Sequence, residues 1–148
     1  MEIITQPEPI FIIGIEARMS NEVAFEEIPV IWQKFYQEAL LEQIPQKVSG
    51  EVFALYTNFE NEGQNNTGLY SFILGAQVKN FDNVPPQFVS AVIPPARRLV
   101  FNVETNHPEK VASKWQEIWT HNEYKKTFIC EYERYKESGE IDIFVGIE

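Results

Sequence analysis

One order of predicted elements, strand–helix–strand–strand, occurs twice along the chain and limits the folds that the chain can adopt. The first set consists of a predicted strand at 10–19, a helix from Pro29 to Leu41, and strands at 51–59 and 69–78. The second set consists of a predicted strand at 97–104, a helix with Pro108 in its first turn, and strands at 127–135 and 140–147. Proline suits the first turn of a helix, where its missing N–H is harmless. Two such modules predict an α+β fold with pseudo-twofold symmetry and a central ligand cleft between the modules.

Hydrophobic periodicity and turn residues support the individual elements. In the first helix, Ile28, Trp32, Phe35 and Ala39 are spaced three or four apart and give one apolar face. The polar stretch at 60–68 is rich in turn formers, so the strands on either side of it are predicted to form a hairpin. Residues 81–95 contain four prolines and are predicted to be an ordered connection rather than a flexible linker.

Length and composition indicate one domain, with halves at roughly 1–80 and 81–148, and a restricted set of partners. Twenty-two acidic residues outnumber 12 basic ones, for a net charge of −10, whereas a nucleic-acid-binding surface normally shows a basic patch. We therefore expect no direct nucleic acid binding. No apolar run approaches the ~20 residues that cross a bilayer, and the N-terminus lacks a secretion signal. These features and a lone cysteine, Cys130, predict a cytoplasmic protein with no membrane partner, in which Cys130 is a small core residue.

The predicted strand at 127–135 places two acids on one face. Strand side chains alternate, so Ile129, Glu131, Glu133 and Tyr135 share one face of this strand. If that face is solvated, Glu131 and Glu133 are ordinary surface charges. If it lines a cavity, the inner acid is a buried anion among aromatic rings, which suits an organic cation.

Several short segments resemble the gyrase-inhibitor-like, or AraC/MerR-type, effector-binding domain. These segments keep the family's order and cover nearly the whole chain; they are residues 28–35, 53–56, 70–78, 84–85, 93–101, 115–119, 132–135 and 140–147. The segment Tyr132-Glu133-Arg134-Tyr135 is similar to the family's acidic strand. Gly146 departs from the family, which often has proline there, and this bears on where the last strand ends.

The resemblance implies a duplicated fold whose central cleft binds amphipathic organic molecules, often lipophilic cations, as multidrug sensors do. It places the pocket glutamate at Glu133. Many members are fused to a DNA-reading domain, whereas nothing precedes Met1 here, so the chain is expected to be a stand-alone binding domain similar to some mobile-cassette proteins. A regulatory protein is a further expected partner, and no cofactor is expected.

Aromatic residues are the other predicted ligand contacts. Tyr56 and Phe72 match aromatic positions of the family, and the remaining predicted contacts are Tyr70, Trp32 and Trp119. Each ring face attracts a cation by about 0.5–2 kcal/mol, so several rings and one carboxylate could give micromolar binding with little shape specificity. The simpler interpretation is that aromatic residues on strands and on apolar helix faces belong to the core. Trp119, at the end of its helix, has the best chance among the tryptophans of reaching the cleft.

Two other classes of function remain open. A Tyr–Glu pair in an aromatic pocket could activate water in a small hydrolase. However, the sequence contains no Ser/His/Asp order, Gly-x-Ser-x-Gly turn, metal cluster or phosphate loop, so a binding protein is expected rather than an enzyme. The third class is a protein-binding module of the gyrase-inhibitor type, with the acidic surface as its interaction face.

Overall fold

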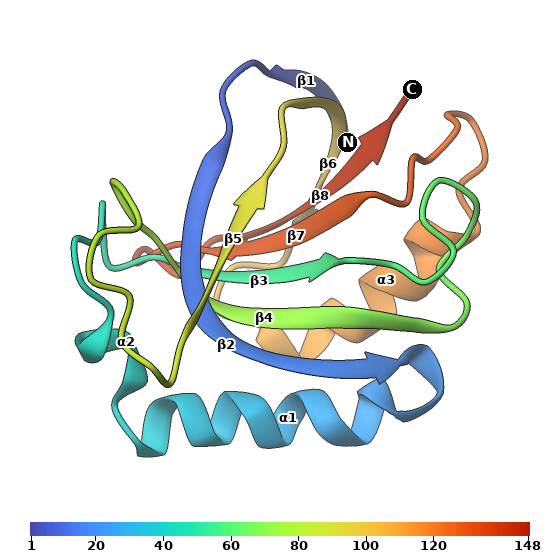
Figure 1. The fold of residues 1–148 in the computed structure, drawn as a ribbon. Helices are drawn as coiled ribbons and strands as arrows, with labels where there is room; N and C mark the ends of the chain where they lie inside the picture. The colour runs from blue at the N-terminus through green and yellow to red at the C-terminus, as the bar shows by residue number, and fades with distance from the viewer.

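The computed structural model describes all 148 residues and contains one eight-stranded antiparallel sheet (Figure 1). The strands are β1 (Glu2–Gln6), β2 (Ile10–Ser20), β3 (Val52–Thr57), β4 (Leu69–Gln77), β5 (Val89–Ile93), β6 (Ala96–Val103), β7 (Cys130–Tyr135) and β8 (Ile141–Ile147). The helices are α1 (Asn21–Gln37), α2 (Leu40–Gln43), the 3₁₀-helix η1 (Pro108–Lys110) and α3 (Val111–Trp119). None of the helices is long and apolar enough to span a membrane.

The strand order β1-β6-β8-β7-β3-β4-β2-β5 follows from the duplicated element order. The modules β2-α1-β3-β4 and β6-α3-β7-β8 meet where β3 pairs with β7, which confirms the predicted α+β fold. At each edge of the sheet one further strand crosses over: β1 pairs with β6, and β5 pairs with β2. The division into halves at 1–80 and 81–148 stays a prediction. β8 continues through Gly146, which lies opposite Arg98 of β6.

Three local predictions from the sequence are wrong. Helix α1 begins at Asn21, directly after β2, so Pro29 lies inside the helix rather than in its first turn. Proline at this position removes the helical N–H donor to the carbonyl of Phe25, and its ring crowds that carbonyl, so the packing of α1 on the sheet must offset this cost. Strands β1 and β5 are absent from the predicted elements. β1 is a short strand at the edge of the sheet. The prolines before and after β5 favour a connection over a strand, although the residues of β5 alternate between more and less exposed positions.

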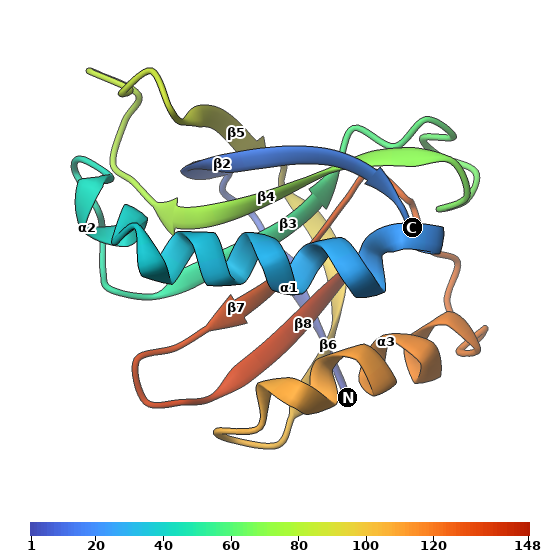
Figure 2. The same ribbon diagram turned by 90° about the horizontal axis from the view of Figure 1, so that it is seen from below.

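Helices α1 and α3 lie on the same face of the sheet (Figure 2). Each packs on the strands of its own module through a separate hydrophobic cluster. Phe35 of α1 packs with residues of β2 and β4, and Val111, Trp115 and Ile118 of α3 pack with residues of β6 and β8. Because these two clusters are separate, the space between the helices above β3 and β7 is not filled by a common core.

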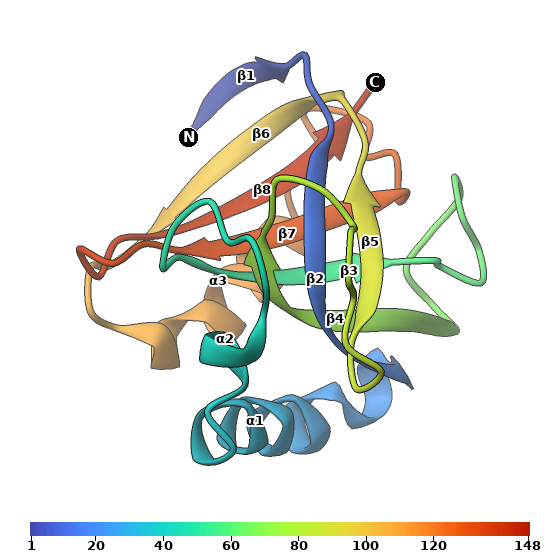
Figure 3. The same cartoon turned by 60° about the vertical axis from the view of Figure 1, so that its left-hand side comes forward.

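The opposite face of the sheet, here called the closed face, carries no helix, and the edge strands of the sheet itself cover it. β2 and β5 run steeply across the direction of β7 and β8 (Figure 3), so the strongly twisted edges fold over this face. A third cluster fills it, including Phe53, Ile73, Val100 and Tyr132.

Candidate functional site

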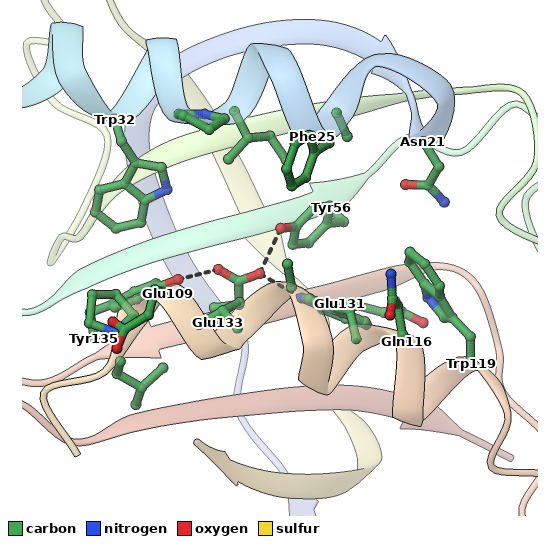
Figure 4. A pocket seen from close by; sticks show the side chains of 18 of the residues that line it. Asn21, Phe25, Trp32, Tyr56, Glu109, Gln116, Trp119, Glu131, Glu133 and Tyr135 are labelled. Atoms are coloured by element: carbon green, nitrogen blue, oxygen red, sulfur yellow. Dashed lines mark hydrogen bonds between the residues drawn. The ribbon is translucent and has the colours of Figure 1, made fainter. Parts of the chain in front are cut away.

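A cavity of about 980 Å³ lies between α1 and α3 (Figure 4). Helix α1 supplies two rows of side chains spaced four residues apart, Asn21, Phe25 and Pro29, and Ala24, Ile28, Trp32 and Tyr36. Residues four apart share a face of an α-helix, so the early start of α1 is what brings Asn21 and Phe25 to the cavity. Helix α3 supplies Val111, Ala112, Trp115, Gln116 and Trp119 by the same spacing.

Glu133 of β7 lies in the wall of this cavity and is only 2% exposed. Its carboxylate accepts three hydrogen bonds. The Tyr56 hydroxyl and the Trp115 Nε1–H both donate to Oε2 at 2.6 Å, and the Tyr135 hydroxyl donates to Oε1 at 2.5 Å. Ala54, a fully buried core residue, lies directly opposite Glu133 on β3.

Burial and the three hydrogen-bond donors shift the pKa of the Glu133 carboxyl in opposite directions. Loss of hydration raises the pKa of the Glu133 carboxyl, while the bonds from Tyr135, Tyr56 and Trp115 lower it, and the net direction is upward. Burial and the neighbouring carboxylate raise the pKa of Tyr56 and of Tyr135 well above the usual range. Both phenols therefore keep their protons and act as donors to Glu133.

Glu131 is a second buried carboxyl in the same wall. It is 4% exposed, and Figure 4 shows it on the Gln116 and Trp119 side of Glu133. Burial raises the pKa of Glu131 to about 7, with Lys126 and Arg98 opposing that rise. Its Oε1 is buried and has no hydrogen-bond partner.

Five of the six predicted contact residues line the cavity: Glu133, Tyr56, Tyr70, Trp32 and Trp119. The ring of Trp32 packs edge-on against Tyr135 at 4.7 Å between centroids, and Tyr56 packs against Trp115 at 5.3 Å. Tyr70 is buried, and its hydroxyl donates to Asn21 Oδ1 at 2.9 Å, so it ties β4 to the start of α1. Trp119 is 44% exposed at the opposite end of the cavity from Trp32 (Figure 4).

Phe72 is the predicted contact that does not line the cavity. Its side chain is fully buried in the cluster beneath α1 and lies 5.4 Å from the ring of Tyr56, between centroids. The Phe72 ring therefore contacts Tyr56 from the core side and not from the cavity. Cys130 is also a core residue, and burial raises the pKa of its thiol to about 11.

Three residues around the buried carboxyl of Glu133 are not among the contacts predicted from the sequence: Trp115, Tyr135 and Glu131. A signal existed for two of them, because Glu131 and Tyr135 alternate with Glu133 on the same face of the strand. Trp115 was expected in the core, and it does pack there, but nothing in the sequence indicates that its indole N–H points to Glu133.

The charged side chains in the wall are four carboxyl groups, those of Glu109, Glu131, Glu133 and Glu140, and one lysine, Lys136. No group of three or more His, Cys, Asp or Glu side chains could hold a metal ion.

Comparison with solved structures confirms the fold. The integron cassette protein VCH_CASS2, from the mobile metagenome of Vibrio cholerae, has a TM-score of 0.80 at 20% identity, over 99% of this chain and 95% of that chain. SAV2435 bound to tetraphenylphosphonium has a TM-score of 0.81 at 14% identity, over 99% of this chain and 93% of that chain. EcmrR in a DNA complex has a TM-score of 0.53 at 13% identity, over 99% of this chain and 56% of that chain.

At these identities the likeness establishes the fold alone. No curated protein is significantly similar in sequence. The family model of Cass2, described as an integron-associated effector binding protein, matches residues 3–147. This match confirms the resemblance to effector-binding domains that the sequence segments indicated. The chain belongs to the family of integron-associated effector binding proteins.

Proposed function

We propose that this protein binds an amphipathic organic cation in the cavity between α1 and α3, with Glu133 as the charge that selects for a cation. The observation that carries this proposal is a carboxylate withdrawn from water in the wall of a cavity of about 980 Å³. Ligand cavities for drug-sized molecules fall in the range of about 300–1,000 Å³, so this one can hold a molecule with several rings.

The environment of Glu133 favours a cation for two reasons. Three uncharged donors hold the carboxylate in one orientation but bring no positive charge to it. The anion therefore keeps its electrostatic attraction for a cation in a poorly hydrated site, where that attraction is stronger than in water. The aromatic faces of Trp32, Tyr56 and Trp119 offer contacts of about 0.5–2 kcal/mol each to a cation.

The solved neighbours support the choice of ligand class. SAV2435 has the same fold and was solved with tetraphenylphosphonium, a bulky lipophilic cation without hydrogen-bond donors. The mostly apolar wall here, with its buried carboxyl groups, suits the same kind of molecule. Because the family is effector-binding, we further propose that occupancy of the cavity is a signal passed to a regulatory partner, without direct contact between this chain and nucleic acid.

The hydrolase interpretation receives less support from the chemistry of the Tyr–Glu pair. A hydrolase of this kind needs a group that takes a proton from water. The Glu133 carboxylate is already engaged by three donors, and Tyr56 and Tyr135 hold their protons tightly because burial raises the pKa of each phenol.

Titration calorimetry with a matched pair of probes tests the proposal. Methyltriphenylphosphonium is a cation, and triphenylphosphine oxide is a neutral molecule of similar size. We expect the cation to bind the wild-type protein with micromolar affinity. We expect Glu133→Gln to lower the affinity for the cation at least tenfold and to leave the affinity for the neutral probe unchanged. Glutamine preserves the shape of the side chain and can still accept the Tyr56 and Trp115 bonds.

The matched control is Glu117→Gln, which removes an exposed carboxyl of α3 outside the cavity. Its affinity for the cation should equal that of the wild type. If Glu133→Gln lost affinity for both probes equally, Glu133 would not select for a cation, and the proposal would be refuted. Absence of cation binding by the wild type would refute it as well.

A further inference from the structure

Glu131 differs from Glu133 in one respect that bears on the ligand. Both carboxyl groups lie on the same face of β7, both are buried, and both line the cavity. Glu133 accepts three hydrogen bonds, whereas Oε1 of Glu131 is buried without any partner. Native proteins rarely leave a buried carboxyl oxygen unpaired, because removing such a group from water without a partner costs free energy.

The nearest opposite residue and the two cations whose charges act on Glu131 all donate hydrogen bonds elsewhere, and none donates to this oxygen. Tyr56 lies directly opposite Glu131 on β3, but its hydroxyl is directed to Glu133. The two cations whose charges act on Glu131 make their hydrogen bonds to other acceptors. Lys126 Nζ donates to the His121 carbonyl, and the Arg98 guanidinium donates to Gln6 and to the carbonyls of Cys130 and Pro94.

We propose that Glu131 is a second ligand contact, which accepts a hydrogen bond from an N–H group of the bound cation. This inference rests on the proposed function and narrows the ligand class to protonated amines or amidinium-type groups attached to an apolar body. In this arrangement Glu133 attracts the positive charge without bonding to it, and Glu131 receives the N–H.

The chemistry of the two carboxyl groups gives a basis for selection among cations. A charge-assisted N–H···O bond is stronger than a neutral one. A quaternary ammonium or phosphonium ion has no N–H and leaves Oε1 of Glu131 unpaired. Sites built around a polar partner discriminate strongly against ligands that lack the matching group. The raised pKa of Glu131, about 7, fits an empty site whose carboxyl is partly protonated until a donor arrives.

Two probes that differ at one position test this inference. N,N-dimethyl-1-naphthylmethylamine is protonated at neutral pH and carries one N–H, and its N-trimethyl analogue carries a methyl group in place of that N–H. We expect the wild type to bind the protonated amine at least tenfold more tightly than the quaternary probe. Glu131→Leu removes the acceptor and should abolish this preference, while Glu131→Gln, which retains a carbonyl acceptor but no charge, should reduce it in part.

A purely steric preference for the smaller probe would survive in Glu131→Leu, and that result would overturn the inference. Equal binding of the two probes by the wild type would overturn it as well. Binding of methyltriphenylphosphonium that depends on Glu133, without any preference for N–H probes, would leave the proposed function standing and refute only the role of Glu131. Absence of binding by every cation would refute both.

A thermal unfolding measurement guards against a misfolded variant. Replacing an unpaired buried carboxyl by an apolar side chain should leave the unfolding temperature of Glu131→Leu equal to that of the wild type or higher. Glu117→Leu, which removes an exposed carboxyl outside the cavity, should keep the wild-type preference for the protonated amine.

Discussion

The two faces of the sheet, the face covered by α1 and α3 and the closed face opposite, each bury an ion that is held by hydrogen bonds, and the two ions have different surroundings. On the closed face, the Arg98 guanidinium is 1% exposed, lies 5.1 Å from the Tyr132 ring centroid, and donates to Gln6 Oε1 and to the carbonyls of Cys130 and Pro94. On the helix face, Glu133 accepts bonds from Tyr56, Tyr135 and Trp115. Both ions are bonded to uncharged partners rather than to an opposite charge.

The difference between the faces lies in the space beside the ion. Arg98 is surrounded by packed side chains, so its charged hydrogen bonds stabilise the fold rather than bind a ligand. Glu133 faces a cavity, because α1 and α3 pack on separate clusters and leave the centre of the sheet uncovered. Burial of a charge is therefore weak evidence for a binding site by itself, and the adjoining cavity supplies the missing part of the argument.

The largest effect is expected on the closed face. Arg98→Met removes three hydrogen bonds from a charged donor, those to Gln6 Oε1 and to the carbonyls of Cys130 and Pro94, so we expect the free energy of unfolding to fall by about 3–5 kcal/mol. Chemical denaturation measures this loss. The neighbouring Arg97 is exposed, and Arg97→Met should change stability by no more than about 0.5 kcal/mol. If Arg98→Met retained wild-type stability, the structural role of this ion would be wrong.

The next effect concerns the pH dependence of stability at Glu131. Burial raises the pKa of this carboxyl from 4.5 to about 7, so the folded state holds its proton more tightly than the unfolded state does. This contribution to stability is fully present below about pH 4.5 and is lost as the pH rises past about 7. Relative to Glu131→Gln, the wild type should lose about 3 kcal/mol between about pH 4 and pH 8. A pH-independent difference between the two proteins would show that Glu131 is solvated.

A smaller effect is expected when one donor to Glu133 is removed. Trp115→Phe keeps a ring but removes the N–H, and Tyr135→Phe removes the hydroxyl. Loss of a donor favours the protonated carboxyl, so the affinity for a phosphonium cation at about pH 6 should fall roughly three- to tenfold. Stability should fall by about 1.5–3 kcal/mol, as for a hydrogen bond to a charged group.

Tyr124→Phe is the matched control, because Tyr124 lies outside the cavity. It should bind the phosphonium cation like the wild type. Unchanged affinity in both donor variants would mean that the hydrogen bonds to Glu133 do not tune its charge.

The smallest effect is expected at the exposed end of the cavity. Trp119→Ala removes one ring face, so cation affinity should fall by about 0.5–1 kcal/mol, or roughly two- to fivefold, in a fluorescence or calorimetric titration. The fold should remain intact, since 44% of this side chain is exposed. Cooperative unfolding at a much lower temperature would instead identify Trp119 as a core residue.

The architecture is largely predictable from the sequence, because element order and periodicity are local properties. The alternation of residues 129–135 is enough to predict that Glu131, Glu133 and Tyr135 share one face of β7. The start of α1 is not predictable from Pro29 alone, since proline is commoner in the first turn of a helix but is tolerated inside one where a single carbonyl can go unpaired.

The finer design of the site depends on contacts between distant segments. Phe72 and Tyr56 lie opposite each other on paired strands, but one ring enters the core and the other borders the cavity. Likewise, the indole N–H of Trp115 reaches Glu133 only because α3 packs over β7, and no periodicity in either segment encodes that bond.

A crystal structure of the protein with methyltriphenylphosphonium tests the central claim most directly. We expect the phosphonium centre between α1 and α3, within about 6 Å of the Glu133 carboxylate, with its phenyl groups against Trp32, Tyr56 or Trp119. A cation bound on the outer surface, or one inside the cavity but remote from Glu133, would contradict the account.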